Sequence, residues 1–228
     1  GVFPTSHFQE AVMARAKEIA GAGRADRKGV ELDALSPSVT QDAISYRHVT
    51  LSFGPTPRMA RLELRLPQDL PAIPSDAREL GASWWPLRAF RELDDALLRL
   101  RFNHSGVGLV VVSTRGRAQD ALALDEQLAA RADDWFVREV RHSMKRVRKR
   151  LDVTAKSFFA VIDEGSCFAG SLLELALASD RQYMLDAEGV AIALSPMNAG
   201  PLPMGNGLTR LQSRFLAKPH HADELSSR

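Results

Sequence analysis

The chain has 228 residues, of which 45% are hydrophobic and 25% charged, and its formal net charge is +2. This length can bury the core of one or two domains, and so small a net charge argues against nucleic acid as the main partner. The single cysteine, Cys167, excludes an internal disulfide and favours a reducing compartment. No apolar run approaches the ~20 residues of a membrane helix. We therefore expect a cytoplasmic protein without a nucleic-acid or membrane partner.

The first residues predict a short helix followed by a linker. Apolar residues recur at helical spacing from Phe8 to Ile19, with Ser6 as a candidate cap, and residues 21–29 are rich in glycine and charge. Both ends of the sequence are abrupt, which suggests a fragment of a longer chain. We expect residues 1–28 to be the closing helix of a preceding half plus a linker, and residues 29–228 to form one domain.

The rest of the chain alternates strands with helices. Strands are predicted at residues 46–51, 60–66, 107–113, 158–163, 181–185 and 190–194. The first two form a hairpin, while the continuous apolar runs at 107–113 and 158–163 are typical of strands covered on both faces. Helices are predicted at residues 87–102, 118–131, 134–151 and 172–179. This alternation predicts an α/β fold with crossover connections.

One segment, residues 158–184, has the pattern of a site. A buried strand runs into a turn of small residues that opens a helix, and free amides at such a turn can hold an oxyanion. Glu174 lies about one turn inside that helix among leucines, where a carboxylate suits general acid–base work. From these residues alone, a tight turn with a surface glutamate is about twice as plausible as a catalytic site.

The residues FAGSLLELALASD, 168–180, resemble the signature of the crotonase (enoyl-CoA hydratase/isomerase) superfamily. The resemblance implies a crotonase-like ββα superhelix, which we expect to be truncated at its C-terminus. It also implies that the Gly170–Ser171 turn supplies an amide to a thioester oxyanion hole, near Ser171, and that Glu174 is the acid/base.

A narrower resemblance joins three segments. The residues GASWWPLRAFRELDDALLRLR (81–101), DDWFVRE (133–139) and EGSCFAGSLLELALASDRQYM (164–184) are together similar to the second half of the benzoyl-CoA-dihydrodiol lyases. The resemblance implies hydrolytic ring opening of an epoxidised or dihydrodiol benzoyl-CoA in aerobic benzoate degradation, which yields formate and a semialdehyde CoA thioester. It implies no metal and no cofactor beyond the coenzyme A of the substrate. It also implies a homo-oligomer, in which this domain packs against a preceding crotonase-like half.

Two departures from the crotonase pattern count against a complete site. The position of a second catalytic glutamate, in the segment ALSPMNAG, is held by Pro196, which cannot transfer a proton. The stretch STRGRAQDALALD, residues 113–125, lacks the loop that supplies the second oxyanion amide. Two alternatives therefore stay open: a degenerate, non-catalytic scaffold half, and an independent enoyl-CoA hydratase or isomerase with a remodelled site.

Other residues carry weaker signals. Cys167 sits in the turn, where it could contact substrate or act as a nucleophile, although lone cysteines are more often small buried residues. Glu164 is a candidate second carboxylate, and a turn residue is the plainer interpretation. The basic helix 134–151 suits the phosphates of coenzyme A, but a solvated face or an acidic partner is favoured. The histidine pair His220 and His221, near the end of the sequence, superficially suggests metal ligands. A disordered tail is the better interpretation of this segment.

Overall fold

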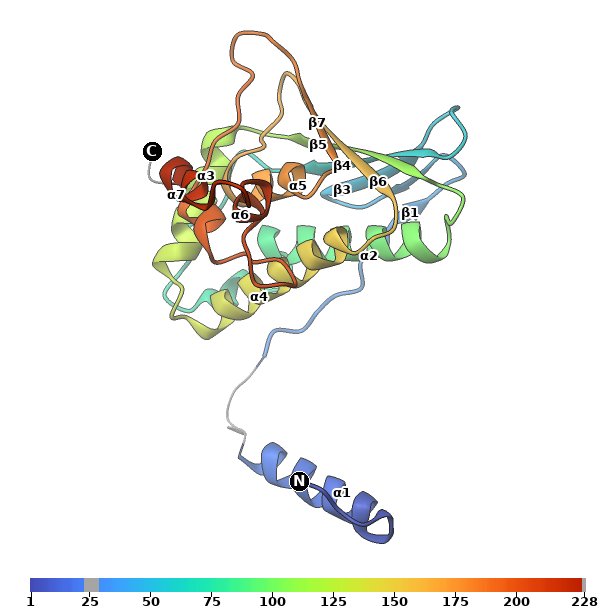
Figure 1. Ribbon diagram of the computed structural model, residues 1–228, viewed down its shortest axis with the longest axis vertical. Helices are drawn as coiled ribbons and strands as arrows, with labels where there is room; N and C mark the ends of the chain where they lie inside the picture. Colours follow the sequence, from blue (N-terminus) through green and yellow to red (C-terminus); the bar gives the residue numbers. More distant parts are fainter. Residues whose placement is uncertain (23–28, 227–228) are drawn as a thin grey trace. The chain divides into compact units, whose positions relative to one another are not determined.

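The computed structural model describes residues 1–22 and 29–226, which form two compact units, Gly1–Glu31 and Leu32–Arg228 (Figure 1). Most of the predicted linker, including the proposed boundary at residue 28, lies outside the described residues, so the division into a preceding half and a second domain stays a prediction. No helix in the described parts of the chain is both long and apolar enough to cross a membrane.

The first unit contains the predicted N-terminal helix, α1 (Thr5–Gly21). The helix is confirmed but its cap is not, because the N-cap position is Pro4 and Ser6 lies inside the first turn. None of its residues is buried, and the apolar side chains of Phe8, Val12 and Ile19 are all exposed.

The second unit is built on a seven-stranded sheet whose strands follow the chain order. The strands are β1 (Ser38–Val39), β2 (Ala43–Ser45), β3 (Val49–Phe53), β4 (Met59–Arg65), β5 (Leu109–Arg115), β6 (Ser157–Ile162) and β7 (Arg181–Met184). Strands β1 to β4 pair antiparallel, and β4 to β7 pair parallel. The hairpin and the crossover connections predicted from the sequence are confirmed.

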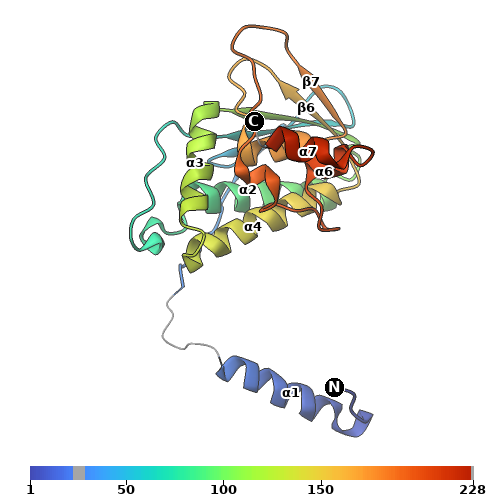
Figure 2. The same cartoon turned by 60° about the vertical axis from the view of Figure 1, so that its left-hand side comes forward.

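The helices of this unit vary widely in length. They are α2 (Trp85–Phe102), α3 (Ala118–Ala130), α4 (Trp135–Asp152), α5 (Leu173–Leu177), α6 (Arg210–Arg214) and α7 (Pro219–Ser226), with 3-10 turns η1 (Ala77–Leu80), η2 (Gly170–Leu172) and η3 (Pro196–Ala199). Both views show α2 and α4 packed side by side beneath one face of the sheet (Figures 1 and 2). Their apolar stripes meet the alternate strand residues that form the core, among them Val110, Val112, Phe158 and Ala160.

Three sequence predictions need correction. Within the described residues, strands β5 and β6 are covered on one face only, because Val111, Phe159 and Val161 on the other face are half-buried. The strand predicted at residues 190–194 is reduced to a single bridge between Ala169 and Ala193. The Ala193 carbonyl accepts a hydrogen bond from the Gly170 N–H in the turn. The predicted disordered tail is helix α7, which is anchored by the buried Ala222.

Candidate functional site

The candidate site is the turn that joins β6 to α5. Gly170 opens η2 with φ +51°, a left-handed conformation that favours glycine. A β-carbon at this position would lie 2.0 Å from Oδ2 of Asp125, so both the backbone and the space require glycine. The turn predicted from the small residues is therefore present, and an aspartate from a distant helix closes against it.

Both amides that could form an oxyanion hole at this turn are already bonded within the chain. The Ser171 N–H donates to Oδ2 of Asp125 at 2.6 Å. The Gly170 N–H donates to the Ala193 carbonyl at 2.9 Å. Ser171 is fully buried, so a thioester oxygen could reach its amide only by displacing Asp125.

Asp125 is brought to the turn by α3, the helix that directly follows β5. Its Oδ2 also accepts the Ser195 hydroxyl at 2.6 Å, whereas its buried Oδ1 has no hydrogen-bond partner among the described residues. Burial raises the pKa of the Asp125 carboxyl, opposed by its bonds to Ser171 and Ser195 and by the charge of Arg148. The carboxylate therefore takes up the Ser171 amide that the sequence analysis expected to face a thioester oxygen.

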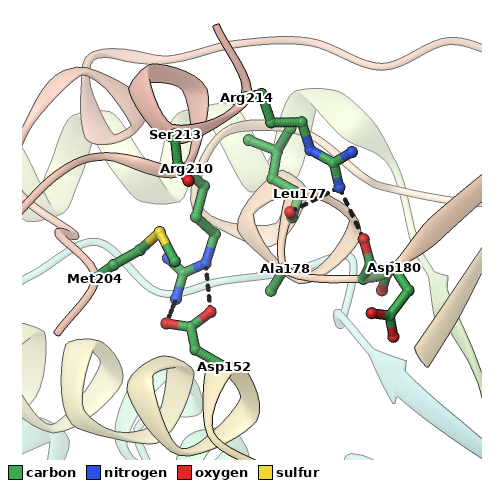
Figure 3. A pocket seen from close by; sticks show the side chains of 9 residues that line it. Asp152, Leu177, Ala178, Asp180, Met204, Arg210, Ser213 and Arg214 are labelled. Atoms are coloured by element: carbon green, nitrogen blue, oxygen red, sulfur yellow. Dashed lines mark hydrogen bonds and ion pairs between the residues drawn. The ribbon is translucent and has the colours of Figure 1, made fainter. Parts of the chain in front are cut away.

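Glu174 is buried and fully engaged by two other residues. Its Oε2 accepts from Nη1 of Arg210 at 2.7 Å, and its Oε1 accepts from Nδ2 of Asn198 at 2.6 Å. Arg210 in turn forms a two-pronged ion pair with Asp152 at the end of α4, which Figure 3 shows at the wall of a polar cavity of about 380 Å³. At 1% exposure, the predicted acid/base sits inside an ion-pair network.

The segment around Pro196 supplies further contacts to this network. Pro196 begins η3, whose capping box pairs Ser195 with Asn198. Nδ2 of Asn198 bonds both the Gly170 carbonyl, at 2.9 Å, and Glu174. The segment that lacks the second glutamate thus holds the glycine turn in place.

Arg148, from helix α4, contacts the backbone of the turn. It is buried, stacks over the ring of Phe90 at 4.3 Å and donates from Nη2 to the Ser171 carbonyl at 2.7 Å. Burial lowers its pKa to about 10, still a cation at neutral pH. Arg148 therefore does not belong to the exposed basic face expected for helix 134–151, and Arg150 of that helix pairs with Asp94.

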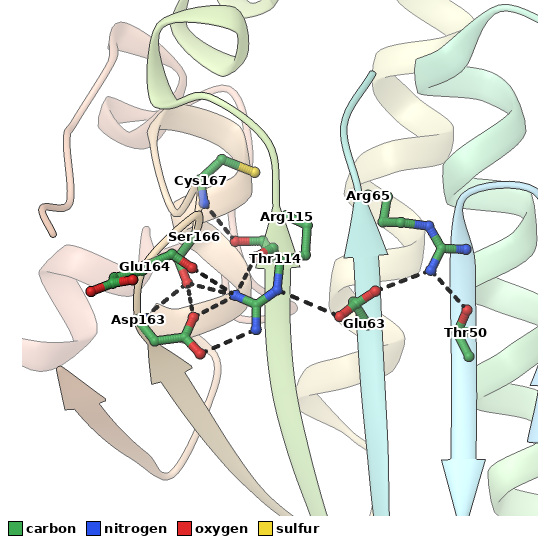
Figure 4. A network of polar contacts seen from close by, with 9 residues as sticks. All are labelled: Thr50, Glu63, Arg65, Thr114, Arg115, Asp163, Glu164, Ser166 and Cys167. Atoms are coloured by element: carbon green, nitrogen blue, oxygen red, sulfur yellow. Dashed lines mark hydrogen bonds and ion pairs between the residues drawn. The ribbon is translucent and has the colours of Figure 1, made fainter. Parts of the chain in front are cut away.

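The structure does not bring Glu164 and Glu174 together. Glu164 is exposed at the end of β6, beside the ion pair between Arg115 and Asp163 (Figure 4). The Arg115 guanidinium, which also reaches Glu63, lowers the pKa of the Asp163 carboxyl. This polar network faces the uncovered side of the sheet, whereas Glu174 lies in the interior.

Cys167 is fully buried in the turn, and its backbone N–H donates to the hydroxyl of Thr114. Burial raises the pKa of its thiol, which disfavours the thiolate that a nucleophile requires. Among the described residues, no group of histidine, cysteine and acidic side chains could hold a metal ion, and His221 instead contacts Glu224 within α7.

Sequence reasoning missed Asp125 and Arg210, and only Asp125 left a signal. Asp125 falls on the same stripe of α3 as Ala121, Leu124 and Leu128, where a charge is out of place on a buried face. Arg210 lies in a short helix of five residues, too short for its spacing to reveal a buried side.

We predict that Asp125→Asn stabilises the protein increasingly as the pH rises. Asparagine keeps an oxygen to accept from Ser171 and Ser195 but removes the buried charge. Because the pKa of Asp125 is raised in the folded state, its contribution is fully present below about pH 4 and is lost as the pH rises through that folded-state value. Urea unfolding at several pH values should show a gain on the order of 1–3 kcal/mol near neutrality. Parallel curves for the two proteins would contradict this account.

We also predict that Cys167 is unreactive in the folded chain. A thiol reagent should modify the native protein about a hundredfold or more slowly than the urea-unfolded protein, because the buried thiol stays protonated. Mass measurement follows the single cysteine without ambiguity. Equal rates in the two states would restore Cys167 as a candidate contact for substrate.

Comparison with known proteins gives this geometry a context. No protein-family model matches the chain. It is 42% identical over 219 residues to benzoyl-CoA-dihydrodiol lyase from Aromatoleum evansii, a match that covers 94% of this chain but only 40% of the relative. An enoyl-CoA hydratase from Geobacillus kaustophilus HTA426 superposes with a TM-score of 0.51 at 16% identity, over 80% of this chain and 61% of that structure. The chain is thus a crotonase-fold homologue of part of benzoyl-CoA-dihydrodiol lyase.

Proposed function

We propose that the chain is the non-catalytic part of a lyase that opens the ring of a dihydrodiol or epoxide of benzoyl-CoA. The observation that carries the structural role is the closed turn: Asp125 holds the Ser171 amide, and Arg210 holds Glu174. A lyase that acts on a dihydrodiol of benzoyl-CoA is supported by the 42% identity to the Aromatoleum evansii enzyme of that name. Formate and a semialdehyde CoA thioester are the products that we propose.

The same proposal covers the setting of the enzyme. We infer a cytoplasmic homo-oligomer that takes coenzyme A as part of its substrate and needs no further cofactor. The single reduced, buried cysteine supports a reducing compartment. Because this chain spans 40% of its relative, the residues that act on the substrate are proposed to lie in the remaining part of the longer protein.

Independent hydratase or isomerase activity is less well supported. Such activity needs an accessible carboxylate beside two free amides, as in an oxyanion hole. At the described turn both amides are bonded internally and Glu174 is buried.

We predict that Glu174→Gln in the full-length lyase lowers stability but leaves the rate of the folded enzyme unchanged within about twofold. Breaking a buried ion pair costs on the order of 3–5 kcal/mol, whereas removing a general acid or base costs roughly 10²–10⁴ in rate. Melting temperature and turnover with the dihydrodiol of benzoyl-CoA, per folded molecule, separate the two effects.

Asp152→Asn is the matched control, because it removes the other carboxylate of the same arginine. If both carboxylates are structural, the two variants lose stability and keep their turnover. A large loss of turnover in Glu174→Gln alone would overturn the structural role and return Glu174 to catalysis.

A further inference from the structure

One face of the sheet in the second unit is uncovered by any helix of that unit in its described part. Helices α2 and α4 lie on the opposite face in both views (Figures 1 and 2). The strand pairing places Arg61, Val111, Phe159 and Arg181 in one row across β4 to β7, and aligns Val161 with Tyr183 in the next. The face therefore combines an apolar centre with charged ends.

The apolar centre is unusual for a solvated surface. Strands β4 to β7 pair parallel, and parallel sheets are nearly always covered on both faces. Here Val111, Phe159 and Val161 are half-buried only by their neighbours, and the ring of Tyr183, packed on Phe159, is 51% exposed. These side chains still expose apolar surface that a partner could bury.

The charged ends of the row differ from the ion pairs beside them. Arg115 is satisfied by Asp163 and Glu63, as Figure 4 shows. Arg61 and Arg181 are exposed, and in the described residues neither side chain has a hydrogen bond or an ion pair. One unpaired guanidinium group therefore lies at each end of an apolar strip. This arrangement favours binding of a protein surface that brings a carboxylate to each end.

The face is also hollowed, with a cavity of about 420 Å³ over β3 to β6. Its lining combines the apolar side chains of Val111 and Val161 and several hydroxyls with the charged residues Arg61, Glu63, Arg115 and Asp163. It can receive a protruding side chain from a partner, which a flat sheet cannot.

The length of the relative indicates what covers this face. The match spans only 40% of the Aromatoleum evansii lyase, so more of that relative lies outside the matched part than within it. We propose that the face defined by Arg61, Val111, Phe159, Val161 and Arg181 is the docking surface for the rest of the same lyase polypeptide. This inference rests on the proposed function, since it requires that the chain works within a longer enzyme.

The test is photo-crosslinking in the full-length protein. A benzoylphenylalanine at Val161 is expected to crosslink within the same polypeptide, to a peptide outside these 228 residues, as identified by mass spectrometry. The same residue at Phe102, which is 75% exposed at the end of α2, is the control and should give no such product. Crosslinks between two polypeptides would show that a second copy covers the face and would overturn the proposal. Absence of a crosslink at Val161 overturns it when the charge reversals described next also leave the melting temperature unchanged.

A second measurement does not depend on the crosslinker fitting the hollow. The double variant Arg61→Glu/Arg181→Glu should lower the melting temperature of the full-length protein, because it reverses both charges at the contact. Arg146→Glu, which changes an exposed arginine of α4 without an ion pair in the described chain, should leave it unchanged. Equal melting temperatures for the two variants would count against the docking surface. Because neither measurement uses turnover, absence of lyase activity would overturn the proposed function and leave this surface to be judged separately.

Discussion

The site depends on one buried carboxylate. Oδ2 of Asp125 accepts the Ser171 amide and the Ser195 hydroxyl, each at 2.6 Å, and so ties α3, η2 and η3 together at a single oxygen. The left-handed glycine before Ser171 allows the approach, because any β-carbon there would collide with that oxygen. The contact leaves the Ser171 amide bonded inside the chain, with a carboxylate oxygen as its acceptor.

The two departures noted in the sequence have one structural explanation. The stretch 113–125, which lacks the expected oxyanion loop, forms the end of β5 and the start of α3 and ends on Asp125. The segment around Pro196, which lacks the second glutamate, supplies Ser195 and Asn198. Each segment that lacks an expected catalytic group therefore contributes side chains that hydrogen-bond at the turn. These bonds pair polar groups that would otherwise be buried without partners, at a cost of roughly 1–3 kcal/mol each.

The sequence predicted strands β3 to β7, the long helices and the glycine turn, because each depends on local spacing or on a residue type with a special conformation. It missed the short strands β1 and β2, and the strand that it predicted at residues 190–194 is a single bridge. It could not predict the contacts made at the turn. Arg210 reaches Glu174 across 36 residues and Asp125 reaches Ser195 across 70, separations that no periodicity encodes. The residues around Glu174 favoured a surface glutamate over a buried carboxylate, and that prediction is wrong, because Glu174 is buried. A buried glutamate is in turn equally consistent with catalysis and with an ion pair. Only the partner decides between the two, and the partner comes from the fold.

The buried polar groups beneath the turn form a cluster of mixed charge. Arg148 and Arg210 provide two cations, and Asp125, Asp152 and Glu174 provide three carboxyl groups. Burial raises the pKa of both Asp125 and Asp152, which favours the neutral form of each carboxyl, and the ion pair with Arg210 opposes this shift at Asp152. The oxygen that accepts from Ser171 and Ser195 therefore belongs to a carboxyl whose buried charge costs stability.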